Sequence, residues 1–433
     1  MPVRLDSQNP GFEASFGALL AMKRELAEDI DQAVKAIIAE VVAKGDAALC
    51  AYSKRFDRAD VEEQGLRVGV DEIDSAVGRC TPDAVGALRF ALARIFAFHE
   101  RQVPQDLRYT DPLGVELGWR WLPVESAGLY VPGGTAAYPS TVLMNAAPAK
   151  VAGVRRLVMA VPATDGQLNP LVLAAAKLAG VDEIYRIGGA QAVAALAYGT
   201  ETIAPVAKIV GPGNAYVAAA KRRVFGAVGI DMIAGPSEVL IIASDDANPQ
   251  WIAADLLAQA EHDAVAQAIL ITDDSALADA VDDEVARQLQ TLPRSAIAGA
   301  SWRDFGAIIV VGGLDEAARL VNLIAPEHLE IMTRNAEALA QNICNAGAIF
   351  IGPYTPEAIG DYVGGTNHVL PTARSARFSS GLSVLDFMKR TSILKCGADS
   401  LAALGKAAIA LGRTEGLHGH ARSVTLRIDP KTT

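Results

Sequence analysis

The sequence predicts an α/β fold built from two parallel β-sheets in tandem. Two series of short apolar runs, each followed by a Gly or Pro turn and then an Ala-rich segment, indicate parallel strands joined by helices. The first series contains "RLVMAVP", "EIYRIGGA" and "KIVGPGN"; the second contains "SEVLIIAS", "QAILITDD", "GAIIVVGG", "HLEIM" and "GAIFIG". With 433 residues, 51% of them hydrophobic, the chain can form more than one sizeable core.

Segments on either side of these series have helical periodicity. Residues 23–102 contain apolar positions that recur on one helix face, as in Val34, Ile37, Ile38, Val41 and Val42. One extended stretch, "GLRVGV", interrupts them. From about residue 382 the chain is again expected to be helical, but this tail has too few apolar positions to fold alone. We therefore expect it to dock on another part of the protein.

These patterns predict four parts of the chain. They are an N-terminal arm at 1–22, a discontinuous first α/β domain at 23–129 with 239–381, a second α/β domain at 130–238, and a C-terminal helical tail at 382–433. No repeat of fixed period and no low-complexity tract marks a different organisation.

The composition excludes several classes of protein. Lys and Arg total 39 against 50 for Asp and Glu, and the net charge of -11, with no basic patch, argues against nucleic acid or anionic membrane as a partner. No apolar stretch approaches the ~18 residues of a membrane span, and "MPVRLDSQNPGF" lacks a secretory apolar region, so a cytoplasmic protein is expected. The four cysteines form no C-x-x-C pair, which argues against a disulfide framework or a thiolate metal site.

The segment "APEHLEI" places Glu327 and His328 side by side within an apolar run. Two groups that can hold or release a proton are poor core material and suit proton transfer. A surface strand edge could carry the same pair without function, and the dipeptide alone leaves both interpretations open.

The segment "LLAQAEHDA" spaces Gln259 and His262 at i, i+3, so both side chains project from one helix face. An imidazole nitrogen with side-chain oxygens suits Zn²⁺, and Asp361 in "IGDYVGGTNH" could add a carboxylate. An ordinary amphipathic helix explains the spacing equally well, and Gln is an uncommon zinc ligand.

Two Gly-rich turns follow strands of the first series. In "VGPGNAYVAAAK" the glycines precede Asn214 at an expected helix N-cap, and "RIGGAQAVAA" repeats the arrangement with Gln191. Neither turn matches G-x-G-x-x-G, so plain βα turns remain the alternative to cofactor binding. In "DMIAGPSEVLIIA", Ser237 enters a buried strand without a G-x-S-x-G elbow, which favours a binding hydroxyl over a nucleophile.

Taken together, these segments resemble the histidinol dehydrogenase family from about residue 30 to 428. The resemblance is carried by "GLYVPGG", "STVLMNAAPA", "GGAQAVAALAYGT", "KIVGPGNAYV", "DMIAGPSEVLIIA", "QAEHD", "NLIAPEHLEI", "GDYVGGTNHVLPT", "ARFSSGLSVLDFMKR" and "EGLHGHARSVTLR". It implies a homodimer of subunits with two incomplete Rossmann-like domains and a C-terminal tail that crosses to the partner subunit. The first domain would carry the metal and catalytic residues, and the second would face NAD.

The resemblance also implies the reaction. Family members oxidise L-histidinol to L-histidine through bound L-histidinaldehyde, using two NAD⁺ in succession and one Zn²⁺ per site. In the catalytic roles that follow, His328 is the base for both oxidations and Glu327 activates the water that hydrates the aldehyde. With an ordinary imidazole pKa of ~6.5, His328 would suit neutral pH.

Further site residues follow from the same resemblance. The metal positions match Gln259, His262, Asp361 and His420, the last reached from the partner subunit. The NAD positions match Tyr130, Gln191 and Asn214. The substrate-contacting positions match Ser237, Gln259, His262, His328, Asp361, His368, Glu415 and His420. In "EGLHGH", His418 offers a second imidazole, although the spacing from Glu415 favours His420.

Other functions use the same side chains. A zinc hydrolase could use Glu327 as the base on a metal-bound water, without a dinucleotide. A related dehydrogenase could act on another small alcohol, since a scaffold can be reused, but "TNHVLPT" and "RFSSGLSVLDF" favour histidinol. A non-catalytic two-lobed binding protein would have no reason to carry the Glu-His pair. Formation of NADH separates the dehydrogenases from the other two.

Overall fold

The computed structural model describes residues 1–22, 28–133 and 138–429. The predicted beginning of the helical region at 23–27, part of the predicted turn at 134–137 and the last four residues of the predicted tail lie outside the described residues. The described chain forms two compact units, one from Met1–Gln102 with Glu125–Phe387, the other from Val103–Val124 with the chain from Met388 onward.

The larger unit contains a six-stranded parallel sheet in the order β1-β11-β10-β9-β12-β13. Its strands are β1 (Val3–Asp6), β9 (Glu238–Ala243), β10 (Gln267–Thr272), β11 (Ala307–Val310), β12 (His328–Met332) and β13 (Ala348–Ile351). The five strands predicted for the second series are confirmed. The N-terminal arm adds a sixth, because β1 pairs with β11 at the edge of the sheet.

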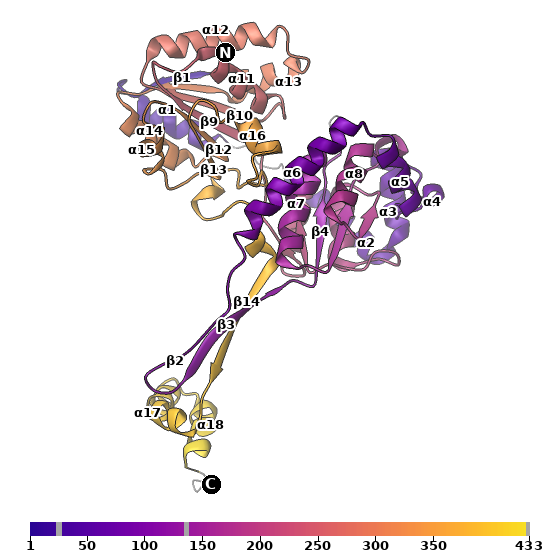
Figure 1. Ribbon diagram of the computed structural model, residues 1–433, viewed down its shortest axis with the longest axis vertical. Coiled ribbons are helices and arrows are strands. Elements are labelled where there is room, and N and C mark those ends of the chain that lie inside the picture. The colour runs from indigo at the N-terminus through magenta and orange to yellow at the C-terminus, as the bar shows by residue number, and fades with distance from the viewer. Residues whose placement is uncertain (23–27, 134–137, 430–433) are drawn as a thin grey trace. The chain divides into compact units, whose positions relative to one another are not determined.

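Helices cover both faces of this sheet (Figure 1). Successive side chains of a strand point to opposite faces, so Leu240 packs in one core and Val239 in the other. The first core also contains residues of α1 (Phe12–Ala21), α14 (Leu314–Ile324) and α15 (Ala336–Ala340). The second contains residues of α11 (Pro249–Ala260), α12 (Ser275–Leu289) and α13 (Ser295–Phe305).

A second, five-stranded parallel sheet in the same unit has the order β6-β5-β4-β7-β8. Its strands are β4 (Ser126–Tyr130), β5 (Arg156–Ala160), β6 (Glu183–Tyr185), β7 (Lys208–Val210) and β8 (Gly229–Ile230). The helices that alternate with them are α7 (Pro139–Ala152), α8 (Pro170–Ala179), α9 (Gly189–Tyr198) and α10 (Ala215–Val224). The three strands predicted for the first series are confirmed.

The sequence predicts that residues 23–129 belong to the first domain, and the described part of that segment is mostly helical. Its helices are α2 (Glu28–Lys44), α3 (Asp46–Tyr52), α4 (Val61–Gln64), α5 (Val70–Gly78) and α6 (Pro82–Glu100), with the π-helical turn η1 (Ser53–Asp57). They pack on the second sheet: α2 contacts α9 and α10, α5 contacts α8, and α6 contacts α7. Helical periodicity identifies the buried face of a helix but not the surface that it covers.

The smaller unit consists of an antiparallel sheet and two helices. The sheet has the order β14-β3-β2, from β2 (Leu107–Thr110), β3 (Glu116–Pro123) and β14 (Met388–Lys395). Helices α17 (Ala398–Thr414) and α18 (His418–Ile428) pack on each other. The predicted helical tail therefore contains a strand, and the prediction missed the hairpin of β2 and β3.

The remaining short elements of the larger unit are η2 (Thr164–Gly166), η3 (Ser375–Arg377), η4 (Val384–Phe387) and α16 (Glu357–Tyr362). Within the described residues, no helix combines the length and the apolar character needed to cross a bilayer. The four cysteines are free thiols.

Candidate active site at the amino edge of the first sheet

Glu327 and His328 lie at the amino end of β12, where both side chains are buried. They are held by the neighbouring strand β9, because the Glu238 N–H donates to Glu327 Oε2 at 2.9 Å and His328 Nδ1 lies 2.9 Å from the Glu238 carbonyl oxygen. A carbonyl oxygen can only accept, so Nδ1 carries the proton and Nε2 keeps its lone pair. Nε2 is buried and has no hydrogen-bond partner. The ring therefore presents an unused basic nitrogen to the site.

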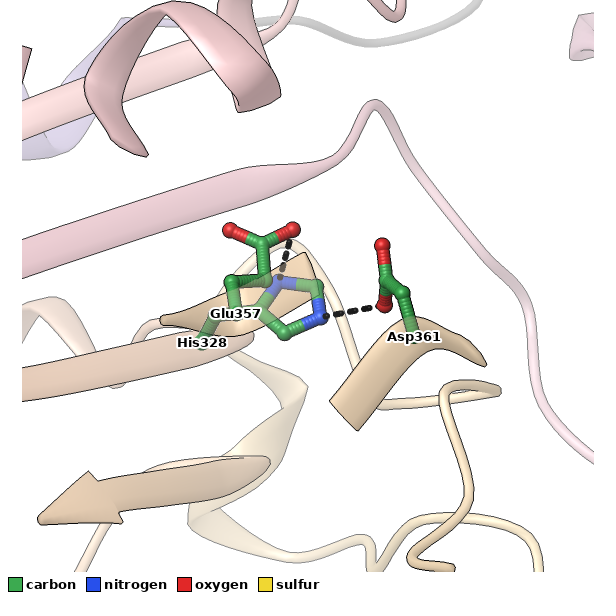
Figure 2. A group of neighbouring side chains, drawn as sticks. All are labelled: His328, Glu357 and Asp361. Carbon is green, nitrogen blue, oxygen red and sulfur yellow. Dashed lines mark ion pairs between the residues drawn. The ribbon is translucent and has the colours of Figure 1, made fainter. Parts of the chain in front are cut away.

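Two carboxylates of α16 flank this imidazole. Glu357 and Asp361 are four residues apart and project from one side of the helix. Glu357 Oε1 lies 3.6 Å from His328 Nδ1, and Asp361 Oδ1 lies 3.9 Å from His328 Nε2. Figure 2 shows one ring nitrogen directed at each carboxylate. The three side chains form a group that could hold a metal ion.

Gln259 and His262 reach the same group from the carboxyl end of α11. Gln259 is fully buried, and in the orientation that satisfies its amide the nitrogen donates to Glu357 Oε1 at 2.7 Å. Its oxygen then accepts from His262 Nδ1 at 3.2 Å. The predicted i, i+3 pair therefore faces the predicted proton-transfer residues, and an amide oxygen and an imidazole nitrogen converge on one point.

His368 lies next to this group, with Nδ1 4.0 Å from Asp361 Oδ1. His368 Nδ1 lies 2.9 Å from the Asp361 carbonyl oxygen, and its Nε2 lies 3.4 Å from Thr141 Oγ1. Ser237 immediately precedes β9, so it adjoins Glu238, whose N–H holds the Glu327 carboxylate. The structure thus brings together six of the sequence-predicted residues: Glu327, His328, Gln259, His262, Asp361 and His368.

Burial dominates the electrostatics of the site. It lowers the pKa of His328 to about 4, against the opposite influence of the Asp361 charge. The expectation of an ordinary imidazole pKa is therefore wrong, because a desolvated ring resists protonation. Burial, followed by the charge of Asp361, raises the pKa of Glu357 well above its ordinary value. A cation would relieve the crowding of these carboxyl groups, so the acids beside Gln259 and His262 fit a bound metal ion.

Next to Glu357 lies a second pair of acids that the sequence did not suggest, the buried Glu330 and the partly buried Asp255. Glu330 accepts the Glu357 N–H at 2.7 Å and so fixes the beginning of α16. Burial, followed by the charge of Asp255, raises the pKa of Glu330 well above its ordinary value, and burial raises the pKa of Asp255 to about 6. Glu357 was also missed, since an acid in the first turn of a helix is ordinary. Its spacing of four residues from Asp361 was the available signal.

The predicted tail residues belong to the smaller unit. Glu415 is the C-cap of α17, and His418 begins α18, which also carries His420. All three side chains are exposed there. The residues of β12, α11 and α16 belong to the larger unit.

The three predicted NAD residues lie at the carboxyl edge of the second sheet. Tyr130 ends β4, Gln191 lies in the first turn of α9, and Asn214 follows β7 as the N-cap of α10. Tyr130 is buried and its hydroxyl accepts the Gly189 N–H at 2.9 Å, which links two of these positions. Burial raises the pKa of Tyr130 to about 12, so the hydroxyl stays neutral. Asn214 Oδ1 caps α10 by accepting from Tyr216 N and Val217 N at 3.0 and 3.2 Å.

Fold and site together define an α/β protein with a buried Glu-His pair beside a group able to hold a cation. Comparison with known proteins identifies the family of this chain. A family model described as histidinol dehydrogenase matches residues 20–428. The chain belongs to the histidinol dehydrogenase family and is an oxidoreductase.

Individual relatives resemble the chain over its whole length. It is 68% identical over 431 residues to histidinol dehydrogenase of Rhodopseudomonas palustris, covering 100% of both chains. It is 67% identical over 429 residues to that of Bradyrhizobium diazoefficiens, covering 99% of this chain and 100% of the relative. The crystal structure of histidinol dehydrogenase from Elizabethkingia anophelis matches with a TM-score of 0.94 at 36% identity, over 100% of this chain and 99% of that one.

Proposed function

We propose that this protein oxidises L-histidinol to L-histidine through bound L-histidinaldehyde, with two NAD⁺ in succession and one Zn²⁺ per site. The observation that carries the proposal is the buried His328 ring, whose unused Nε2 faces Asp361 while Nδ1 is held by Glu238. Membership of the histidinol dehydrogenase family supplies the substrate.

In the first oxidation His328 removes the hydroxyl proton of the alcohol. The substrate loses a hydride from carbon and a proton from oxygen, and NAD⁺ supplies the acceptor for the hydride. Because burial lowers the pKa of His328 to about 4, Nε2 is unprotonated at neutral pH and ready to accept the proton. The carboxylate of Asp361, 3.9 Å from Nε2, stabilises the imidazolium that forms.

In the second oxidation Glu327 acts first. The aldehyde has no hydroxyl proton, so water must add to its carbonyl carbon. The Glu327 carboxylate takes a proton from that water, and the His328 imidazolium left by the first oxidation returns its proton to the carbonyl oxygen, which gives the gem-diol. His328 then removes a hydroxyl proton from the gem-diol as the second hydride leaves, and the product is the carboxylic acid. The two residues are buried neighbours, which lets one bound substrate use both without release.

Gln259, His262 and Asp361 are the proposed zinc ligands from this subunit, with His420 of the partner subunit as the fourth. Support comes from the 3.2 Å approach of the Gln259 oxygen to His262 Nδ1 and from the crowded acids beside them. When bound, Zn²⁺ would supply a fixed positive charge that orients the substrate nitrogens. Ser237, His368 and Glu415, the last from the partner, are the further substrate contacts that we propose.

The proposed homodimer with exchanged tails is supported by the smaller unit. Helices α17 and α18 bury few side chains, and apolar residues of this unit that remain exposed include Leu394, Leu411, Leu417, Leu426 and Ile428. A unit this poorly buried does not reach the stability of an independent domain. A second copy of the chain would cover these residues and receive Glu415 and His420.

The proposed NAD site lies at the second sheet, between Tyr130, Gln191 and Asn214. The strand order places β5 on one side of β4 and β7 on the other, so the carboxyl ends of β4 and β7 form a topological switch point. Ligands of open α/β sheets bind at such points. The turn at Gly211 and the N-terminus of α10 lie at this place.

The test is NADH formation by the zinc-loaded protein from L-histidinol, compared with His328→Asn. Asn keeps a donor where Nδ1 donates to Glu238 but has no group at the position of Nε2. We expect the rate to fall by ~10² to 10⁴. Absence of NADH with the wild-type protein, together with hydrolysis of an ester or amide, would support the zinc hydrolase instead. NADH from another small alcohol in preference to L-histidinol would support a related dehydrogenase.

A further inference from the structure

We propose that the buried ion pair of Lys221 and Asp231 is a positioning device for the dinucleotide, which holds the turn 211–214 in the shape that NAD⁺ contacts. The inference rests on the proposed NAD⁺ dependence and adds two residues to it. Neither residue is one of the proposed NAD contacts. Lys221 lies in α10, and Asp231 directly follows β8.

Lys221 and Asp231 hydrogen-bond to both backbone polar groups of Gly211. Lys221 Nζ forms an ion pair with Asp231 Oδ1 and donates to the Gly211 carbonyl oxygen at 2.9 Å. Asp231 Oδ2 accepts the Gly211 N–H at 2.8 Å, and Oδ1 also accepts the Met232 N–H at 2.6 Å. The two side chains are 2% and 1% exposed. Gly211 is therefore fixed from two directions by charges that water does not screen.

These hydrogen bonds hold Gly211 in an unusual backbone conformation. Its φ is +112°, and a Cβ there would lie 2.2 Å from the Tyr130 carbonyl oxygen. Only glycine fits, yet glycine has the most backbone freedom to lose. The ion pair of Lys221 and Asp231 restricts the backbone of Gly211, which directly follows β7 beside the end of β4. Three residues later Asn214 caps α10, so the position of Gly211 sets where the helix N-terminus points.

The buried ion pair of Lys221 and Asp231 is weak evidence for a stabilising role. The other buried positions of α10 are apolar, namely Val217, Ala218, Ala219, Ala220 and Val224. Replacing a buried ion pair by packed apolar side chains is often neutral or stabilising, so the pair is poorly explained by stability alone. A role in fixing one turn geometry explains why charges stand there. Lys221 lies in α10, the helix that follows the turn 211–214. Its contacts therefore join the turn, α10 and Asp231 to one another.

The test compares two double variants of the same sheet. Lys221→Met with Asp231→Asn removes both charges together, so no unpaired charge remains. Arg156→Met with Glu183→Gln is the matched control: this pair, 2.7 Å apart, joins the amino ends of β5 and β6, at the opposite edge from the turn. Thermal unfolding and calorimetric NAD⁺ titration are measured for each, followed by steady-state kinetics.

For the Lys221 and Asp231 variant we expect KM and Kd for NAD⁺ to rise about tenfold or more, with kcat changed less than about threefold and KM for L-histidinol unchanged. The control should leave Kd for NAD⁺ within about twofold even where it lowers the unfolding temperature. Lys221→Arg, which keeps the charge and the donors, should bind NAD⁺ more tightly than Lys221→Met.

Unchanged NAD⁺ affinity in a folded Lys221 and Asp231 variant would overturn the inference, as would an equal loss in the control. If the double variant does not fold, Kd for NAD⁺ is compared between Lys221→Arg and Lys221→Gln. Weaker binding by Lys221→Gln would support the inference, and equal binding would overturn it. A wild-type protein that binds NAD⁺ but forms no NADH from L-histidinol would refute the proposed reaction alone. A wild-type protein that binds no NAD⁺ would refute both.

Discussion

Replacing Glu327 by Gln separates the two proposed oxidations. Gln is the same size, and its amide oxygen can still accept the Glu238 N–H that now lies 2.9 Å from Glu327 Oε2. The change removes the base for hydration, which only the aldehyde needs. We expect oxidation of L-histidinaldehyde to slow by ~10² to 10⁴, or about 3 to 5 kcal/mol of barrier.

The first oxidation should slow much less. The lost carboxylate lies 3.7 Å from His328 Nδ1, so His328 loses one of its stabilising charges. Asp361 remains 3.9 Å from His328 Nε2, and we expect this loss to cost about tenfold.

The assay is single-turnover NADH appearance at saturating NAD⁺, started either from L-histidinol or from L-histidinaldehyde. Glu337→Gln, an exposed position on α15, is the matched control and should change neither rate. Thermal unfolding shows whether the Glu327 variant is intact. Equal slowing of both steps would refute the division of roles and make Glu327 and His328 one coupled acid-base unit.

Three further predictions concern the metal, the dimer and pH. Chelation should abolish turnover, and His262→Asn should weaken zinc retention by deleting a nitrogen donor, as metal analysis of the dialysed protein would show; full activity in verified metal-free protein would exclude the zinc proposal. Mixing inactive Glu327→Gln, His328→Ala subunits with inactive His420→Ala subunits should restore activity, because heterodimers contain one intact shared site; demonstrated subunit exchange without activity would contradict tail exchange. Burial raises the pKa of Asp57 to about 6 from 3.8, so the folded state binds more protons between these pH values and stability falls as pH rises through them. Asp57→Asn should therefore stabilise the protein by about 1 to 2 kcal/mol at pH 7, after allowance for partial exposure, and by little near pH 4, as denaturant titrations would measure; an equal effect at both pH values would count against the assignment.

The parallel strands were predictable because burial on both faces requires continuous apolar runs. "SEVLIIAS" and "QAILITDD" became β9 and β10, whose residues are all buried. The hairpin of β2 and β3 was not predictable in this way, since every residue of β2 is exposed. An apolar pattern cannot signal a strand that has no buried face within its own chain.

The sequence predicted which site residues share a helix face, but not which side chains and backbone groups meet across strands. The spacing of Gln259 and His262 predicted a shared helix face, and both do face the group around His328. That Glu238 fixes the tautomer of His328 depends on the register of β9 with β12, which no local pattern encodes. The lowered pKa of His328 likewise arises from burial, which depends on tertiary packing.

The ratio of NADH formed to L-histidinol consumed tests the central claim most directly. The zinc-loaded protein is incubated with limiting L-histidinol and excess NAD⁺, and both NADH and L-histidine are measured at completion. Two oxidations at one site, with Glu327 and His328 acting in turn, predict two NADH and one L-histidine for each L-histidinol. One NADH per L-histidinol, with L-histidinaldehyde accumulating in solution, would contradict the account.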